Sequence, residues 1–202
     1  YAGTSDGNIW RNSPAAGTWT EITGSLPQRY VTAIEGSPDN QDVVFVSHSG
    51  YKDGVYIPHI HKSIDNGTTW IDISGDLPQM GINDVCIKPG HNDSILFVAN
   101  DAGVYYTTNG GTNWGRLGLG MPTIPVFDIE IDLINNKLIA GTFARSVQSC
   151  SLDNLNIITS NNTVMKEMAI EVFPNPTTDY LRVRKLPIGA TVDLYDMTGK
   201  PM

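Results

Sequence analysis

The chain has 202 residues, of which 40% are hydrophobic and 17% charged, a composition typical of a soluble globular protein with a sizeable core. Thirteen basic and 21 acidic side chains give a net charge of -8, so we expect no nucleic-acid partner. No apolar run approaches the roughly 18 residues of a membrane helix, so no membrane span is predicted. The two cysteines, Cys86 and Cys150, have no CxxC spacing, which argues against a metal knuckle and a disulfide-stapled miniprotein.

The abundance of Gly and Pro, with 20 and 12 residues, favours short strands joined by turns over helices. The sequence begins at Tyr1 inside a strand-like segment without a signal peptide, so we interpret the chain as an internal fragment of a longer protein.

A repeat dominates residues 1–152. A turn containing Pro recurs as Leu26-Pro27-Gln28, Leu77-Pro78-Gln79 and Met121-Pro122. Tryptophans recur at the same intervals of 51 and 44 residues, at Trp19, Trp70 and Trp114. Such a period indicates one supersecondary unit per repeat.

Each repeat has the same order of predicted strands. A first strand follows the Pro turn, at 31–34, 82–85 and 126–129, and a second strand follows at 43–46, 95–98 and 138–140, with 1–4 as its earliest copy. Third strands are expected to begin near Gly54-Val55-Tyr56 and Gly103-Val104-Tyr105, and fourth strands at 18–22 and 69–73. Four short strands per repeat predict the blade of a β-propeller.

The predicted fold is therefore all-β, with an incomplete ring of about four blades. The strand count gives three strands of a first blade, two complete blades and at least three strands of a fourth. The outer strand of the last blade is expected to be either 155–158 or a strand from the lost N-terminus that closes the ring, and the sequence favours neither.

A local motif lies between the third and fourth strands. The segment Ser63-Ile-Asp-Asn-Gly-Thr-Thr-Trp70 is one copy, and Thr107-Thr-Asn-Gly-Gly-Thr-Asn-Trp114 is a weaker one. In the first copy an acidic residue can accept backbone N–H bonds, a glycine permits a positive φ, and the tryptophan packs over the hairpin. The roles expected for these residues are structural: Ser63, Asp65, Gly67, Thr69, Trp70, Asn109, Gly111 and Trp114.

The motif resembles the Asp-box, S-x-D-x-G-x-T-W, at every fixed position of its first copy. Asp-box blades are similar to those of sialidases, sortilin-type receptors and xyloglucanases, and residues 1–152 most resemble xyloglucanase-like propellers of secreted bacterial proteins. The resemblance implies that the box lies at the blade periphery, so that Asp65 is not expected to be a catalyst.

The tail has a different character. Residues 153–167 read as a linker or a last outer strand, and residues 168–202 alternate apolar and polar side chains as a small β module does. Two motifs of this module resemble those of the C-terminal sorting domain of the type IX secretion system: Pro174, Asn175, Pro176, Leu194, Tyr195, Asp196, Gly199 and Lys200. The resemblance implies that residues 168–202 form the start of a small β-sandwich. The resemblance implies delivery by that machinery to the cell surface or outside the cell, by a signal that is truncated at Met202.

Candidate sites in the propeller segment are few. His59 and His61, with His48 nearby, share one face of an extended strand and could ligate a metal, but no third ligand is fixed and we predict no zinc site. Glycoside hydrolysis needs two carboxylates, and the first strands offer Asp84, Asp128 and Glu130. The first two occupy equivalent repeat positions, which favours architecture over catalysis.

Two further sets of side chains bear on carbohydrate binding. The arginines that a sialidase would need are scattered, at Arg11, Arg29, Arg116 and Arg145. Four tyrosines could stack on sugars if they are exposed, namely Tyr51, Tyr56, Tyr105 and Tyr106. Aromatic residues on propeller strands more often pack between blades, so we expect packing instead. We therefore predict a non-catalytic scaffold that binds glycan or protein, without a cofactor. The alternative is a fragment of a carbohydrate-active glycoside hydrolase whose catalytic residues are expected in the missing blades.

Overall fold

A computed structural model describes residues 1–13, 16–49, 54, 56–118, 120–153, 155, 171–173 and 182–184. The chain divides into two compact units, residues 1–160 and 161–202. Every regular element among the described residues is a β-strand. None of these residues forms a helix that could cross a membrane.

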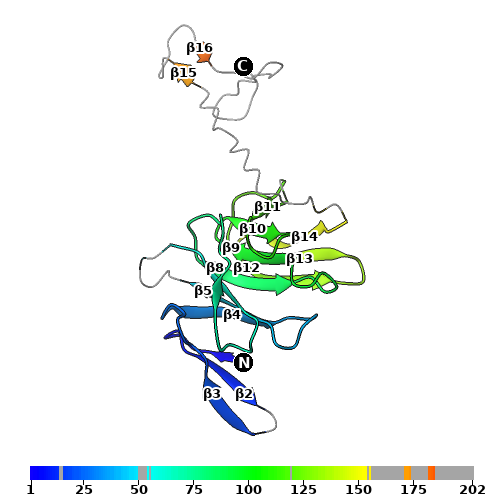
Figure 1. Ribbon diagram of the computed structural model, residues 1–202. Helices are drawn as coiled ribbons and strands as arrows, with labels where there is room; N and C mark the ends of the chain where they lie inside the picture. The colour runs from blue at the N-terminus through cyan, green and yellow to red at the C-terminus, as the bar shows by residue number, and fades with distance from the viewer. Residues whose placement is uncertain are drawn as a thin grey trace. The chain divides into compact units, whose positions relative to one another are not determined.

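The described residues of the first unit form four antiparallel sheets (Figure 1). The first sheet has the order β1-β2-β3, with β1 at Ala2–Gly3, β2 at Ile9–Ser13 and β3 at Thr18–Glu21. The second has the order β4-β5-β6-β7, with β4 at Tyr30–Gly36, β5 at Val44–Ser49, β6 at His59–Ser63 and β7 at Ile71–Asp72.

The next two sheets repeat this arrangement. The third consists of β8 at Ile82–Ile87, β9 at Leu96–Asn100, β10 at Gly103–Thr107 and β11 at Gly115–Leu117. The fourth consists of β12 at Val126–Asp132, β13 at Lys137–Thr142 and β14 at Ser146–Ser151. In each of these sheets the strands follow chain order, as they do in a propeller blade.

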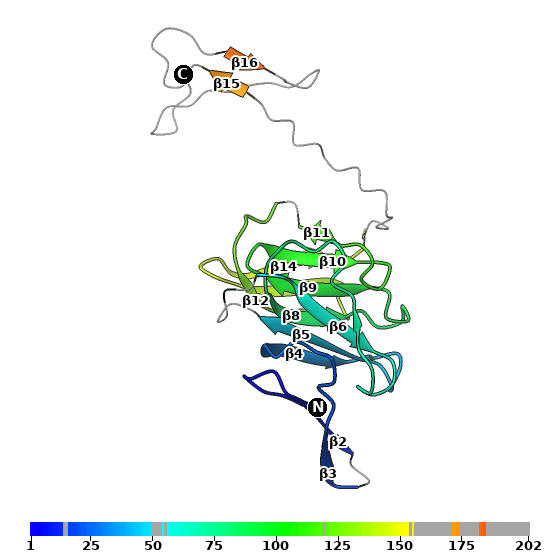
Figure 2. The same ribbon diagram turned by 60° about the vertical axis from the view of Figure 1, so that its left-hand side comes forward.

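Consecutive sheets pack face to face through their first two strands, so that β4, β8 and β12 succeed one another in space (Figure 2). One apolar cluster lies between the first and second sheets around Ile9 and Val46, and a second lies between the second and third around Phe45 and Val85. A third cluster joins the third and fourth sheets around Phe97 and Ile129. Each blade interface therefore has its own core.

These observations confirm the predicted fold class, an all-β partial propeller with strands divided three, four, four and three among the sheets. One strand boundary was wrong: the third strand of the second blade begins at His59, not near Gly54-Val55-Tyr56. Pro58 directly precedes this strand, and a proline lacks the N–H that a ladder position needs.

In the second unit, the structure describes a hairpin of β15 (Glu171–Phe173) and β16 (Arg182–Arg184). The sorting-motif residues Pro174 to Pro176 and Leu194 to Lys200 lie outside the described residues, as does the larger part of 155–158. The predicted domain boundaries and the identity of the tail stay predictions.

Candidate functional site: an aromatic groove at the inner strands

Three equivalent β-bulges mark the beginnings of the inner strands. The register of each inner strand against its neighbour shifts at Thr32 in β4, at Asn83 in β8 and at Phe127 in β12. A bulge adds one unpaired residue and turns its side chain away from the regular alternation. Each of these three blades therefore has, at the same position of its inner strand, a side chain that departs from the regular alternation between the two faces of the sheet.

A groove of about 470 Å³ lies at this end of the second, third and fourth sheets. Its wall includes the bulge residues Asn83 and Phe127. It also includes three residues that directly follow or end the second strands, namely Ser49, Asp101 and Phe143. The groove thus combines side chains from three blades on repeat-equivalent positions.

Three aromatic side chains in the groove are exposed. The exposed fractions are 56% for Tyr56, 55% for Phe127 and 61% for Phe143, and the two phenylalanine rings meet edge to face with centroids 6.4 Å apart. The backbone N–H of Phe143 donates to the carbonyl of Pro125 at 2.9 Å, which fixes the two segments to each other. Large apolar rings at the surface of a groove are a common feature of ligand sites.

Polar groups lie beside these rings in defined orientations. The Nδ2 of Asn83 donates to Asp101 Oδ1 at 3.1 Å and to the carbonyl of Val126 at 2.8 Å. These bonds hold the Asp101 carboxylate at the groove and link the third sheet to the fourth. Aromatic faces next to fixed polar atoms can bind a ligand that has both an apolar face and hydroxyl groups.

Further along the same inner strands, four carboxylates surround a shallow depression of about 450 Å³. It is lined by Glu35, Asp84, Asp128 and Glu130. Both oxygens of Asp84 are engaged, since Oδ1 accepts the N–H of Val85 at 2.9 Å and Oδ2 accepts the N–H of Ile129 at 2.8 Å. Asp84 therefore ties the third inner strand to the fourth.

Burial raises the pKa of Asp84 above its ordinary value, and its two backbone hydrogen bonds oppose this shift. Burial, followed by the charge of Asp84, also raises the pKa of Glu35, although much of that side chain is exposed. Carboxyl groups with raised pKa values are candidates for general acids. Asp128 and Glu130 are exposed, so they contribute charge to the depression without being buried in it.

The Ser63-to-Trp70 motif forms the hairpin between β6 and β7, at the outer side of the second sheet. Ser63 Oγ accepts the N–H of Gly67 at 2.7 Å and donates to Asp65 Oδ1 at 2.8 Å. Asp65 also accepts the N–H and the hydroxyl of Thr69, at 2.8 and 2.7 Å, and the Thr69 backbone bond is the main reason why its pKa is lowered. Asp65 thus serves the turn.

Both motif tryptophans reach the preceding blade. Trp70 Nε1 donates to the carbonyl of Ile22 at 2.8 Å, and Trp114 Nε1 donates to that of Ile73 at 3.0 Å. In the second copy, Thr107 Oγ1 accepts the N–H of Gly111 at 3.1 Å. Trp19, by contrast, is 52% exposed.

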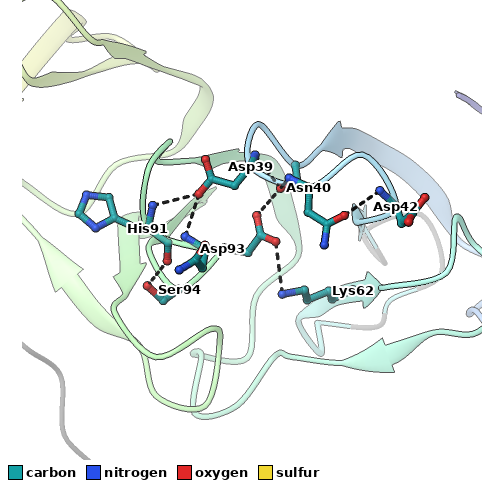
Figure 3. Close-up of polar contacts among 9 residues, drawn as sticks. Asp39, Asn40, Asp42, Lys62, His91, Asp93 and Ser94 are labelled. Atoms are coloured by element: carbon teal, nitrogen blue, oxygen red, sulfur yellow. Dashed lines mark hydrogen bonds and ion pairs between the residues drawn. The ribbon is translucent and has the colours of Figure 1, made fainter.

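A second polar link between blades lies in the turns after the inner strands (Figure 3). The Asp39 carboxylate accepts the N–H groups of Gly90, His91 and Asn92 at 2.8 to 2.9 Å, and these bonds lower its pKa. Asp93 is 4% exposed and forms an ion pair with Lys62 at 3.7 Å. Since these carboxylates already have partners, this cluster fastens the second and third blades together.

The other sequence candidates fall in different places. Arg11 and Arg116 donate to backbone carbonyls, of Asn66 at 2.8 Å and Met121 at 3.0 Å. Tyr106 is buried at 8% exposure and stacks on Phe97, in agreement with the expectation that such tyrosines pack in the core. Tyr105 packs against the core between the second and third sheets, and Tyr51 lies outside the described residues.

Phe127 and Phe143 were not singled out from the sequence, although both belong to the groove. The signal that could have found them is the repeat itself. In the register of the sheets Phe127 occupies the place of Thr32 and Asn83, and Phe143 that of Ser49 and Asp101. Large aromatic residues at positions that are polar in the other blades indicate a local departure from the repeat.

The strand order, bulges and blade interfaces define a segment of a β-propeller, and comparison with solved structures shows the same fold. The GH74 enzyme of Niastella koreensis aligns with 74% of this chain and 26% of its own, with a TM-score of 0.57 and 18% sequence identity. The GH74 xyloglucanase of Xanthomonas campestris aligns with 76% of this chain and 28% of its own, with a TM-score of 0.55 and 15% identity. YCF48 from Cyanidioschyzon merolae is also similar (TM-score 0.57, 14% identity, 46% of that chain).

This chain therefore spans between about a quarter and a half of the length of these neighbours. At such low identity the likeness shows the fold alone, and one fold can carry several functions. No protein-family model matches the sequence, and no curated protein matches it. The function must be argued from the residues.

Proposed function

We propose that this propeller segment is a non-catalytic carbohydrate-binding scaffold, in which the aromatic groove stacks on sugar rings. The observation that carries the proposal is the exposure of Tyr56, Phe127 and Phe143 around one groove, beside the fixed polar pair Asn83 and Asp101. Pyranose rings have an apolar face that covers an aromatic ring and equatorial hydroxyls that bind amides and carboxylates. Two neighbours with the same fold are glycoside hydrolases by name, which agrees with a carbohydrate ligand.

Titration of the whole chain with β-1,4-linked gluco-oligosaccharides and xyloglucan oligosaccharides, followed by calorimetry, tests the proposal. We expect saturable binding by the unmutated chain. Phe127→Ala and Phe143→Ala should each weaken it by about five- to tenfold, since a sugar stacked on an aromatic ring contributes on the order of 1 kcal/mol. Both rings are more than half exposed, so their removal should leave the fold intact.

Trp19→Ala is the matched control, because Trp19 is equally exposed but lies in the first sheet, outside the groove. It should bind as the unmutated chain does. No binding to any of these sugars, or equal losses in all three variants, would contradict a role for the groove.

A glycoside hydrolase is the second candidate, and the carboxylates of the inner strands favour it. Asp84 has a raised pKa, as a general acid requires, and it lies among three other carboxyl groups. Against catalysis, both of its oxygens accept backbone N–H groups. An assay for reducing ends released from xyloglucan distinguishes the hydrolase from the scaffold. We expect no protein-dependent turnover. Turnover that Asp84→Asn abolishes would support the hydrolase instead.

We further propose that the protein acts at the cell surface or outside the cell. Support for this comes from the sequence of the tail, where Pro174-Asn175-Pro176 and Leu194-Tyr195-Asp196 resemble a type IX sorting domain. In a bacterium that has this secretion system, the full-length protein should appear outside the cell. Its retention in a strain with an intact system would contradict the proposal.

A further inference from the structure

Three of the four histidines of the chain lie on one face of the second sheet. His48 in β5 is paired directly with His59 in β6, and His61 follows two residues later on the same strand. Paired residues and residues two apart project from the same face, so the three imidazoles lie together. The ring centroids are 6.0 Å apart for His48 and His61, and 6.4 Å for His59 and His61.

The face that carries them is turned toward the first sheet. Val46 precedes His48 by two residues on the same face of β5, and it packs in the apolar cluster with Ile9 and Ile22 of the first blade. His48 is fully buried at 0% exposure, while His59 and His61 are partly buried. The imidazoles therefore lie in the interface between two blades.

Four imidazole nitrogens in this interface have no hydrogen-bond partner among the residues that the structure describes. Both nitrogens of His48, Nε2 of His59 and Nδ1 of His61 are shielded from solvent and make no hydrogen bond within the described part of the chain. Leaving one buried polar atom unpaired costs about 1–3 kcal/mol, so four such atoms in one cluster require an explanation.

The repeat shows that the blade architecture does not need these imidazoles. At the positions of His48, His59 and His61 the third sheet has Asn100, Gly103 and Tyr105, and the fourth has Thr142, Ser146 and Gln148. The motif position of Ser63, two residues beyond His61, is a hydroxyl-bearing threonine in the third sheet. The histidines are thus particular to the second blade, whereas its structural residues recur.

The sequence alone fixed no third ligand and led us to predict no zinc site, but the pairing of β5 with β6 places His48 beside the other two histidines. We propose that His48, His59 and His61 bind a divalent first-row transition metal ion, of which Zn²⁺ is the probe, in the interface between the first and second sheets. Three imidazole nitrogens are a donor set that zinc accepts, with a fourth position left for another ligand. Asp72 in β7 pairs with His61 and lies on the same face. One of its oxygens accepts the N–H of Ser74 at 2.8 Å, and its charge favours a cation at this place.

As the rings lie, no three His, Cys, Asp or Glu side chains in the described residues are close enough to hold an ion. With Zn–N bonds of about 2.0 Å, two imidazoles on a tetrahedral ion have centroids about 5 Å apart. The rings of His48 and His61, and those of His59 and His61, must therefore approach by roughly 1 Å. Binding requires rotation of these side chains about their χ angles. The strand pairing places the three histidines close together, and binding of the ion would bring their nitrogens into coordinating positions.

Calorimetric titration of the chelator-treated full chain with Zn²⁺ tests the site. We expect one ion per chain and a higher melting temperature with zinc, because the ion binds the folded state. His59→Gln and His61→Gln each remove a ligand from a partly buried position, and each should weaken binding at least about 100-fold, more than the loss of an outer partner does. His91→Gln is the matched control, since His91 is exposed in a turn of the third blade and should not matter.

A second measurement needs no variant. Long-range ¹H–¹⁵N spectra of the unmutated chain resolve imidazole nitrogens, and zinc should shift those of three histidines while the fourth stays in place. Absence of saturable binding would overturn the proposal, as would unchanged affinity in His59→Gln and His61→Gln. A loss in His91→Gln as large as in these variants, or a shift confined to His91, would also overturn it.

Discussion

The tryptophan of the second motif copy offers a sharp test of how the blades are held together. Trp114 is 7% exposed within the core between the second and third sheets, and its Nε1 donates to the carbonyl of Ile73 at 3.0 Å. Trp114→Phe keeps an aromatic ring in this core but removes the N–H and part of the ring system. The perturbation therefore separates the inter-blade hydrogen bond from simple aromatic packing.

The expected destabilisation has two parts. An unpaired buried carbonyl costs about 1–3 kcal/mol, and the smaller apolar area that a phenyl ring buries adds about 1 kcal/mol. The free energy of unfolding should fall by about 2–4 kcal/mol, which in a domain of this size lowers Tm by about 4–16 °C. Trp70→Phe should change stability in the same direction, because Trp70 Nε1 donates to the carbonyl of Ile22 at 2.8 Å.

Urea unfolding followed by far-UV circular dichroism is the appropriate assay, because each substitution removes a fluorophore. Trp19→Phe is the control: its ring is 52% exposed, so its unfolding free energy should change by less than about 0.5 kcal/mol. If Trp114→Phe were as stable as this control, the bond from the indole to the preceding blade would not stabilise the fold, and the role assigned to it would be refuted.

Two further predictions concern small residues in the blades. Burial, and after it the neighbouring carboxylates, raises the pKa of Cys86, so iodoacetamide should modify the native protein at Cys150 well before Cys86, as peptide mass spectrometry can measure; equal rates would contradict this. Gly67→Ala should lower the free energy of unfolding by about 2–4 kcal/mol in the urea assay, because φ is +87° and the new Cβ would overlap Ile22. Gly110→Ala is the comparison: φ is +69° and the atom nearest to the new Cβ is 3.8 Å away, so the loss should be only about 1 kcal/mol. Equal losses in the two variants would show that the overlap with Ile22 is relieved.

Much of the fold could be predicted from the sequence because the repeat carries the information several times. Two copies of an Asn- or Asp-bearing turn before a tryptophan, and three Pro-bounded strand pairs, placed all four sheets and their strand counts. The start of β6 was misplaced because Gly54-Val55-Tyr56 resembles Gly103-Val104-Tyr105, where β10 does begin. The second blade has a longer segment between its second and third strands, and local sequence similarity does not show where such an inserted segment ends.

The groove was less predictable than the sheets. Tyr56 could be named as a possible sugar contact from the sequence. Phe127 and Phe143 could be noticed there only as departures from the polar residues of the other blades, and their exposure and edge-to-face packing had to come from the structure. A phenylalanine in an apolar strand ordinarily belongs to the core, and the bulge that turns Phe127 outward leaves no mark in the sequence. The fate of a single side chain in a strand depends on register, which only pairing fixes.

The repeat also supplies an internal control for deciding which side chains are architecture. A residue that every blade needs must recur in register, as Ser63 and Thr107 do, since each hydroxyl accepts the N–H of a glycine in its hairpin. A residue particular to one blade serves something that the others lack. Phe127 and the histidine cluster depart from the repeat in this way, whereas Asp84 and Asp128 share one register position. By this criterion the two binding sites that we propose lie at departures from the repeat, and the carboxylate of Asp84 belongs to the repeated structure.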